Sequence, residues 1–378
     1  MIIGNQINES NILHYILIMA LLAFIIAFAM TPVSIKLAHK IGAIDVPKDG
    51  RRMHHRPIPR FGGLAIYLAT TITMLVFVGN NESIRTAIIG GTLMYLLGAV
   101  DDLLQLKALT KFAGQTVIAI IMYVMGIRIT FITNYFGPGN WDFGVALSCI
   151  VTIGWIVGVT NAINLMDGLD GLAAGIAMII GVTLAYVAYI HGEGGSIIVC
   201  LAMVALAGAC AGFLPYNFSP ARTFMGDGGA LFLGFMISIM SVISPLKRAT
   251  FVAALVPILA LAIPIFDTLF AIVRRLIKHE GIMTPDKGHI HHRIMKSGFG
   301  QRRSVLIIYG IVATMGMSAV MISRELYKEA VVLALIATMY LLVILADHKH
   351  EKKEEPEGWI KKAKPKNGED EWIKDEIN

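Results

Sequence analysis

Residues 84–102 read IRTAIIGGTLMYLLGAVDD, and this segment indicates what kind of protein the chain is. It is an apolar run of about the length that a membrane-spanning helix needs, ~20 residues, and it ends in two adjacent aspartates. Asp167, Asp170 and Asp227 also lie at the ends of long apolar runs. When the runs are threaded through a bilayer in order, all five aspartates reach the same membrane surface.

The composition agrees with a membrane protein. The chain has 378 residues, of which 56% are hydrophobic and 15% charged, and its mean hydropathy is +0.69. Soluble domains carry about 25% charged residues. We therefore expect an all-α, polytopic integral membrane protein with about 11 transmembrane helices, the first of them retained rather than cleaved. The expected spans lie near 14–38, 61–79, 84–100, 112–127, 145–165, 171–190, 195–214, 229–244, 249–273, 304–322 and 329–346.

Lys and Arg set the orientation, because they are enriched in cytoplasmic connections. With the N-terminus outside, the inner connections 39–60, 101–111 and 274–303 and the C-terminal tail hold most of the basic residues. We predict an outer N-terminus and a cytoplasmic C-terminus. Residues 1–346 would form the membrane catalytic domain and 347–378 a polar tail. The net charge of +6 reflects this bias and does not indicate nucleic-acid binding.

Asp101 and Asp102 would lie at the C-terminal, negative end of their helix, which is unfavourable without a compensating cation. A charged stop at the membrane boundary is the simpler interpretation. The functional interpretation is a metal ligand together with a general base.

Asp167 and Asp170 are three residues apart in NAINLMDGLDGLAAG, residues 161–175. If they open the helix that follows, they share one of its faces. Helix capping and glycine-mediated packing are the alternative. Asn164, within the preceding span, is an amide that we expect to bind a polar ligand or another amide rather than lipid.

Asp227 lies in MGDGG, where glycines leave the backbone open, and we favour a ligand role over a simple turn. His289, His291 and His292 follow Lys287 and suit phosphate oxygens better than zinc. Asp267 is an ionisable residue within a span, for which a functional role and a local ion pair are equally favoured.

Carboxylates gathered at one surface repel one another unless a cation lies among them. Their oxygen atoms select Mg²⁺, or Mn²⁺, over softer metals. Mg²⁺ takes one or two carboxylates and completes its shell with water and substrate phosphates. Neighbouring cations, with Lys111 among them, would hold the remaining phosphate charge. The pattern therefore predicts phosphoryl or phospho-sugar transfer.

Four motifs in order, GAVDDLLQL, NAINLMDGLDGLAAG, NFSPARTFMGDGGALFLG and PDKGHIHHR, resemble the polyprenyl-phosphate N-acetylhexosamine-1-phosphate transferases of glycosyltransferase family 4. RRMHHRPIPRFGG, residues 51–63, is similar to the WecA/TagO branch rather than to the related MraY branch. The resemblance implies Mg²⁺-dependent transfer of GlcNAc-1-phosphate from UDP-GlcNAc to undecaprenyl phosphate at the cytoplasmic face. The products are UMP and GlcNAc-pyrophosphoryl-undecaprenol, which starts teichoic acid or O-antigen-type glycans.

The resemblance also implies roles for single residues. Asp227 would bind Mg²⁺, Asp101 would act as base toward the lipid phosphate, and Asp102 would support the metal or that base. Asp167 and Asp170 would lie near the nucleotide, and Asn217 would position the sugar nucleotide. The expected phosphate contacts are His289, His291 and His292, and the expected anion contacts are Arg51, Arg52 and His54.

Several alternatives stay open. The sugar could be another UDP-N-acetylhexosamine or UDP-MurNAc-pentapeptide, and a homodimer is neither required nor opposed. A cation transporter would need acidic residues near the bilayer midplane, where only Asp267 is expected. A scaffold protein would have no need for aspartates opposite histidines.

Overall fold

Of the residues that the computed structural model describes, 81% are helical, which confirms a polytopic, mostly helical membrane protein. It describes residues 11–46, 56–133, 140–191, 195–243, 258–259, 261–277, 294–295 and 299–347. The elements are α1 (Ile12–Ile41), β1 (Ile44–Asp45), β2 (Ile58–Pro59), α2 (Gly63–Val78), α3 (Glu82–Leu104), α4 (Ala108–Val124), β3 (Phe131–Thr133), β4 (Asn140–Asp142), α5 (Val145–Leu165), α6 (Leu172–Ile190), α7 (Gly195–Asn217), α8 (Gly226–Ile243), α10 (Ala262–Ile277), α12 (Gln301–Ser323) and α13 (Tyr327–Asp347).

Each predicted apolar segment overlaps one of these helices. Within the described residues, eight helices are long and apolar enough to cross a membrane, whereas α2 and α4 are apolar but shorter. Eleven spans and the placement of the termini thus stay predictions. The predicted tail, 347–378, lies beyond the described residues except for Asp347.

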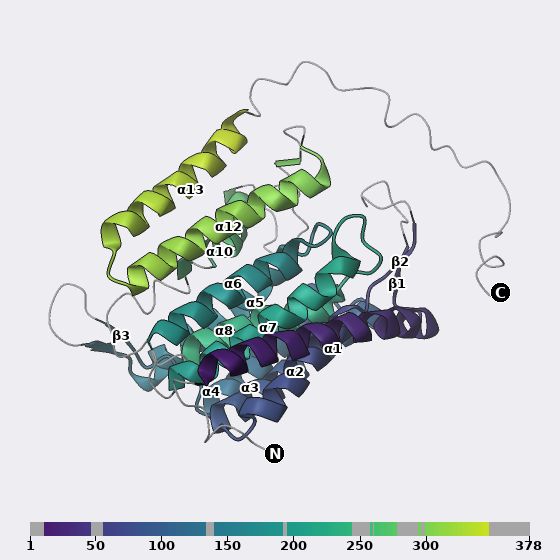
Figure 1. The fold of residues 1–378 in the computed structure, drawn as a ribbon, viewed down its shortest axis with the longest axis horizontal. Coiled ribbons are helices and arrows are strands. Elements are labelled where there is room, and N and C mark those ends of the chain that lie inside the picture. The colour runs from purple at the N-terminus through teal and green to yellow at the C-terminus, as the bar shows by residue number, and fades with distance from the viewer. Residues whose placement is uncertain are drawn as a thin grey trace.

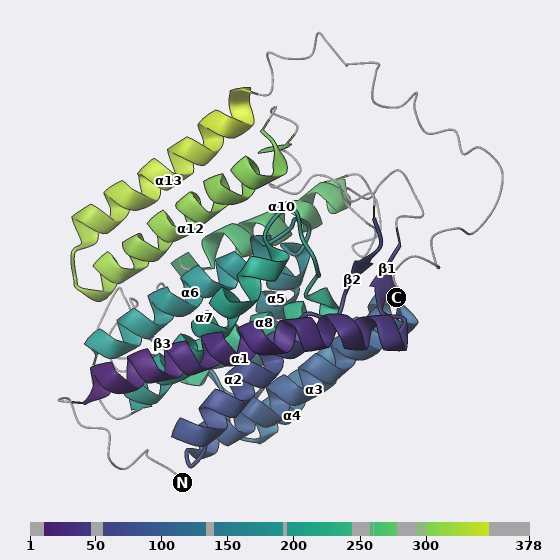
Figure 2. The same cartoon turned by 45° about the vertical axis from the view of Figure 1, so that its right-hand side comes forward.

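The helices pack around α8. In its most apolar 18-residue stretch 83% of the residues are buried, against 22% in α1 and 17% in α13. α8 packs against α3 and α5, while α7 packs against α1 and α6. α12 and α13 form an antiparallel pair beside α6 at one edge of the bundle (Figures 1 and 2). A central helix that is buried on all sides can hold polar groups away from lipid.

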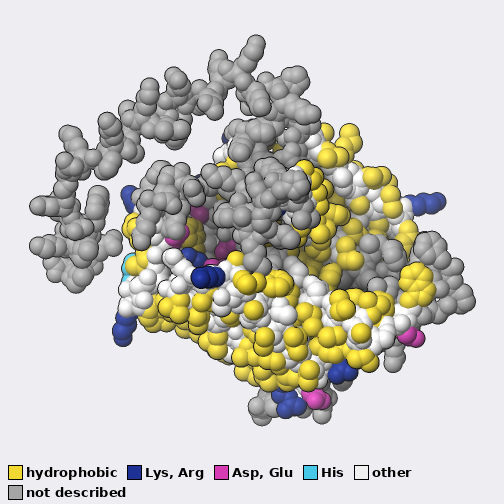
Figure 3. Space-filling model, turned by 180° about the vertical axis from the view of Figure 1, so that it is seen from behind, with side chains coloured by type: hydrophobic (Ala, Val, Ile, Leu, Met, Phe, Trp, Pro, Cys, Tyr) yellow, Lys and Arg dark blue, Asp and Glu magenta, His cyan; other side chains and the backbone are white. Residues whose placement is uncertain are grey.

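Apolar side chains dominate the outer surface. Large exposed examples are Leu17 and Leu21 on α1 and Leu335 and Met339 on α13. Figure 3 shows that hydrophobic side chains cover much of one face, with Lys and Arg mostly at its edges. This is the surface expected of a protein that is surrounded by hydrocarbon.

The all-α expectation omitted four short strands. β1 pairs antiparallel with β2, and β3 with β4, in two separate two-stranded sheets. Strands of two or three residues are too short to show an alternating apolar pattern, so periodicity could not predict them. The first sheet matters for the site, because it lies next to Arg60.

Candidate active site

Asp102 joins the end of one helix to the start of another. Its carboxylate accepts hydrogen bonds from the backbone N–H groups of Asp227 (2.8 Å) and Gly228 (3.0 Å), at the N-terminus of α8. Arg60 also contacts it, with Nη2 2.8 Å from Oδ1. The unfavourable position at the end of α3 is thus offset by the positive end of α8 and by a guanidinium group.

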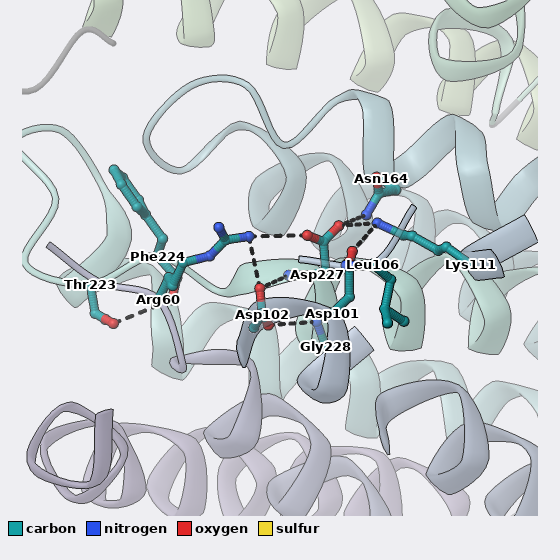
Figure 4. A network of polar contacts seen from close by, with 10 residues as sticks. All are labelled: Arg60, Asp101, Asp102, Leu106, Lys111, Asn164, Thr223, Phe224, Asp227 and Gly228. Atoms are coloured by element: carbon teal, nitrogen blue, oxygen red, sulfur yellow. Dashed lines mark hydrogen bonds and ion pairs between the residues drawn. The ribbon is translucent and has the colours of Figure 1, made fainter. Parts of the chain in front are cut away.

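Asp227 is the hub of the site. Its Oδ2 lies 3.0 Å from Arg60 Nη2, and its Oδ1 accepts hydrogen bonds from Lys111 Nζ and, at 2.8 Å, from Asn164 Nδ2. Figure 4 shows these side chains converging on Asp227. The Asp227 side chain keeps 21% of its surface exposed, whereas that of Asp102 keeps 1%. Asp227 is therefore the carboxylate of this pair that a ligand can reach.

Asp101 is fixed by two donors. Its Oδ1 accepts from the backbone N–H of Leu106 at 2.7 Å, and its Oδ2 lies 2.9 Å from Lys111 Nζ. Lys111 therefore bridges Asp101 and Asp227. The structure therefore brings together four of the predicted site residues: Asp101, Asp102, Lys111 and Asp227.

Arg60 belongs to the site but was not among the predicted site residues. The backbone around it pairs with the segment before α8: Phe224 N–H donates to Pro59 O (2.8 Å), and Gly62 N–H donates to Phe224 O (2.9 Å). Burial alone would lower the pKa of Arg60, but the carboxylates of Asp102 and Asp227 raise it above its usual value. Arg60 ends the basic segment 51–60, and that position was its only signal in the sequence.

Two glycines allow the close approach on which the site depends. A methyl group at position 98 of α3 would overlap the carbonyl oxygen of Asp227. Gly226 has φ +70°, a conformation that side chains other than glycine adopt with strain, and a methyl group there would overlap Oδ2 of Asp102. Both positions need glycine so that the carboxylate of Asp102 can reach the backbone at the start of α8.

Asp167 and Asp170 precede α6 and do not share a face of it, because the helix begins at Leu172 after Gly171 with φ +79°. Gly171 adopts the left-handed conformation, and the two aspartates lie in the turn before the helix starts. Asp170 Oδ2 accepts from the backbone N–H of Ala221 at 3.0 Å, so it ties this turn to the segment before α8. The pKa of Asp167 is raised to about 7, mainly by burial and also by the charges of Asp227 and Asp102, while Arg60 opposes the shift.

Asn217, at the end of α7, is buried and uses its amide within the protein. Its Nδ2 donates to Thr223 O at 2.9 Å, and its Oδ1 accepts from Gly171 N–H at 3.1 Å. It holds together the turn before α6 and the segment before α8. Its contact with the sugar nucleotide stays a prediction.

Some predicted residues and contacts fall outside the part of the chain that the structure describes. These are the basic segment before β2 and the histidine element: Arg51, Arg52, His54, His289, His291 and His292. Asp267 is described and buried on α10, 1% exposed.

The chemistry of the donors suits a hard divalent cation. Arg60 and Lys111 face three carboxylates, those of Asp101, Asp102 and Asp227, so the cluster keeps one formal negative charge. Within the described residues, no three His, Cys, Asp or Glu side chains form a complete metal cage. Mg²⁺ needs none, because it relies on one or two carboxylates plus water and substrate phosphates. Asp227 meets that requirement, because its side chain is partly exposed.

The sequence model of the family described as "glycosyl transferase family 4" matches this chain over residues 84–245. That segment holds Asp101, Asp102, Lys111, Asn164 and Asp227, and it excludes Arg60. The match therefore covers most of the cluster described above.

Full-length relatives extend the match to nearly the whole chain. A Bacillus subtilis protein named "probable undecaprenyl-phosphate N-acetylglucosaminyl 1-phosphate transferase" is 39% identical over 87% of this chain and 90% of its own. A Mycobacterium tuberculosis decaprenyl-phosphate N-acetylglucosaminephosphotransferase is 34% identical, over 86% and 88%. A Clostridium perfringens phospho-N-acetylmuramoyl-pentapeptide-transferase is 31% identical, over 80% and 95%. This chain therefore belongs to glycosyl transferase family 4, among the polyprenyl-phosphate N-acetylhexosamine-1-phosphate transferases.

Proposed function

We propose that this protein transfers GlcNAc-1-phosphate from UDP-GlcNAc to undecaprenyl phosphate. The observation that carries the proposal is the cluster of Arg60, Lys111 and three aspartates around Asp227, in a chain similar over most of its length to transferases named for this reaction. The product is GlcNAc-pyrophosphoryl-undecaprenol, a starting lipid for teichoic acid or O-antigen-type glycans.

The reaction is a displacement at phosphorus. An oxygen of the lipid phosphate attacks the β-phosphorus of UDP-GlcNAc, the bond from that phosphorus to the bridging oxygen breaks, and UMP leaves with the bonding electrons. The lipid phosphate is already an anion at neutral pH, so it needs positioning and charge neutralisation more than activation. Direct attack is therefore favoured over a covalent aspartyl intermediate.

The site residues divide these tasks. Arg60 and Lys111 neutralise the pyrophosphate oxygens, because both already lie beside Asp227. Asp101 would accept a proton from the lipid phosphate and, through Lys111, orient it. Asp167, Asp170, Asn164 and Asn217 would surround the sugar nucleotide, while the basic and histidine-rich segments would add further anion contacts.

Asp227 would hold Mg²⁺ or Mn²⁺, with Asp102 in support. When bound, the metal would supply positive charge for the pyrophosphate. Since both oxygens of Asp102 already accept backbone hydrogen bonds, its contribution would be to hold the start of α8, and with it Asp227, in place. We place the site at the cytoplasmic surface of a bacterial plasma membrane, where nucleotide sugars are made and where the basic connections lie.

The test uses purified protein in detergent with undecaprenyl phosphate, Mg²⁺ and radiolabelled UDP-GlcNAc. We expect label in the lipid fraction, release of UMP, and loss of both with EDTA. Asp227→Asn should lower turnover by about hundredfold or more, since it removes a preorganised charge at the reacting phosphates. Unchanged turnover in a folded D227N variant would refute the assigned role.

UDP-MurNAc-pentapeptide is the second candidate donor, because the Clostridium perfringens relative is named for that chemistry. UDP-GlcNAc is preferred because the more similar relatives are named for N-acetylglucosamine. The same assay with UDP-MurNAc-pentapeptide and UDP-GalNAc distinguishes the three donors.

A further inference from the structure

A second pair of polar side chains lies one helical turn deeper than the site. Gln115 on α4 follows Lys111 by four residues, and Asn161 on α5 precedes Asn164 by three. Asn161 Nδ2 donates to Gln115 Oε1 at 2.5 Å and to the backbone carbonyl of Val157 at 2.8 Å. The two helices are thus joined by an amide–amide hydrogen bond.

The spacing places this bond directly below the site. Residues three or four apart share a helix face, so Gln115 lies below Lys111 and Asn161 below Asn164. Lys111 and Asn164 both donate to Oδ1 of Asp227, and Figure 4 shows them approaching it from α4 and α5. The two helices therefore meet twice, at the carboxylate oxygen and again at the amides.

Stability alone does not explain the amides. Gln115 has no exposed surface, and its Nε2 has no hydrogen-bond partner among the described residues. Gln115 lies seven residues into α4, about 10 Å along the helix. A buried polar atom without a partner lowers stability, whereas two apolar side chains of the same shape would be nearly neutral. The amides therefore serve something other than adhesion between α4 and α5.

We propose that Gln115 and Asn161 are positioning residues, whose hydrogen bond fixes the register of α4 against α5. This register lets Lys111 Nζ and Asn164 Nδ2 meet on one oxygen of Asp227. A slip of one residue moves a helix by about 1.5 Å, and a misplacement of about 1 Å at a reacting centre can cost about hundredfold in rate. The inference rests on the proposed function for its kinetic consequence.

The kinetic test compares three variants in the transfer assay. Gln115→Met with Asn161→Leu removes the hydrogen bond and keeps the volume. The exchange Gln115→Asn with Asn161→Gln keeps an amide on each helix and the same combined side-chain length. Thr116→Val is the matched control, because Thr116 neighbours Gln115 and its hydroxyl donates a hydrogen bond within α4, to Phe112 O.

We expect kcat of Q115M/N161L to fall about tenfold or more, with both KM values changed less than about threefold. Its Tm should stay close to that of the wild type, the exchanged pair should recover most of kcat, and T116V should match the wild type. Unchanged kcat in Q115M/N161L overturns the proposal. If Q115M/N161L does not fold, the exchanged pair Q115N/N161Q tests the proposal instead. A kcat close to that of the wild type would then support the proposal, and a tenfold lower kcat would overturn it.

A second measurement does not depend on turnover. Spin labels at Leu109 of α4 and Gly158 of α5, both exposed, report the spacing of the helices once Cys149, Cys200 and Cys210 are replaced by alanine. The distance distribution should shift or broaden in Q115M/N161L, and an unchanged distribution overturns the positioning role. A wild type that labels no lipid would refute the proposed function instead, and the spin-label result would still decide the register.

Discussion

At the scale of single residues, the site balances like charges by sharing Arg60 and Lys111 between carboxylates, since each of the two cations also contacts Asp227. Asp101 has the Leu106 amide and Lys111, and Asp102 has two amides of α8 and Arg60. Carboxylates this close would otherwise repel one another. Losing a single donor should therefore disturb more than one carboxylate.

Arg60 provides the sharpest test, because its Nη2 contacts both Asp102 and Asp227. Arg60→Met should lower turnover by about hundredfold, since it removes a charged contact to both carboxylates. Arg60→Lys should retain more activity, because it keeps the charge but not the planar fork. The transfer assay measures both effects. Arg85→Met, at an exposed position of α3, is the matched control, and an equal loss in R85M would contradict a specific role.

Asp167 should make stability depend on pH. Its folded-state pKa of about 7 lies above the ordinary value of 3.8, so the folded chain keeps a proton that the unfolded chain releases. The stabilising contribution is complete below pH 3.8 and is lost as the pH rises through 7. Without Mg²⁺, Asp167→Asn should therefore raise Tm relative to the wild type at pH 8.5 more than at pH 5.5.

Thermal unfolding in detergent with EDTA measures this difference. Asp142→Asn, at an exposed position of β4, is the control for removing a carboxylate elsewhere. A Tm difference between D167N and wild type that is the same at both pH values would contradict the raised pKa of Asp167.

Sequence reasoning found the aspartates but not their partners. Asp101, Asp102 and Asp227 were identifiable because acidic residues at the ends of apolar runs are costly without a function. Arg60 looked like any other basic residue of a cytoplasmic connection. Its contacts depend on the backbone pairing of residues 59–62 with 224, which joins segments far apart in the chain and has no local signature.

At the scale of elements, the site depends on how closely α3 approaches α8. Gly98 faces the backbone at the start of α8, and Asp102, one turn further along α3, caps that helix. Small residues permit such close contacts between membrane helices. The carboxylate can cap its neighbour only while the two backbones stay this close.

Gly98→Ala should therefore separate α3 from α8. We expect a cost of about 1–3 kcal/mol from overpacking, seen as a lower Tm, together with a large loss of turnover. Gly154→Ala on α5 is the matched control, because a methyl group there meets nothing within 4 Å. That control should keep its activity and gain a little stability, since alanine favours a helix over glycine. A G98A variant with wild-type Tm and turnover would contradict the packing argument.

The elements themselves were largely predictable. Long apolar runs gave the helices, because hydropathy is a strong signal over ~20 residues. The start of α6 was harder to place, since it depends on the left-handed conformation of Gly171. The short strands β1 to β4 carry no periodic pattern, so only tertiary pairing reveals them.

At the scale of the whole molecule, α12 connects the bundle edge to the site. Tyr309 donates to Gly171 O at 2.5 Å, and Arg302 Nε donates to Ser219 O at 2.7 Å. These are the turn before α6 and the segment before α8. At the other end of α12, Ser323 forms a hydrogen bond with His191 at 2.8 Å. One helix thus spans from the site to the opposite end of the bundle.

The predicted orientation can be tested with reporters. Green fluorescent protein fused to the C-terminus should fluoresce, because that end is predicted to be cytoplasmic. Alkaline phosphatase fused after Ile190, at the end of α6, should be active, because that connection is predicted to be outside. The reverse pattern would invert the topology and place the aspartates on the outer surface.

Arg60 contacts Asp227, and Tyr309 contacts the turn before α6; these contacts have a consequence for inhibitor resistance. The family match covers residues 84–245, yet Arg60 precedes it and Tyr309 follows it. Substitutions selected by a compound that binds beside Asp227 should therefore arise in flanking segments as well as in the matched region. A resistance survey that sequences only the matched region would overlook them, so screening should read the gene from α1 through α12.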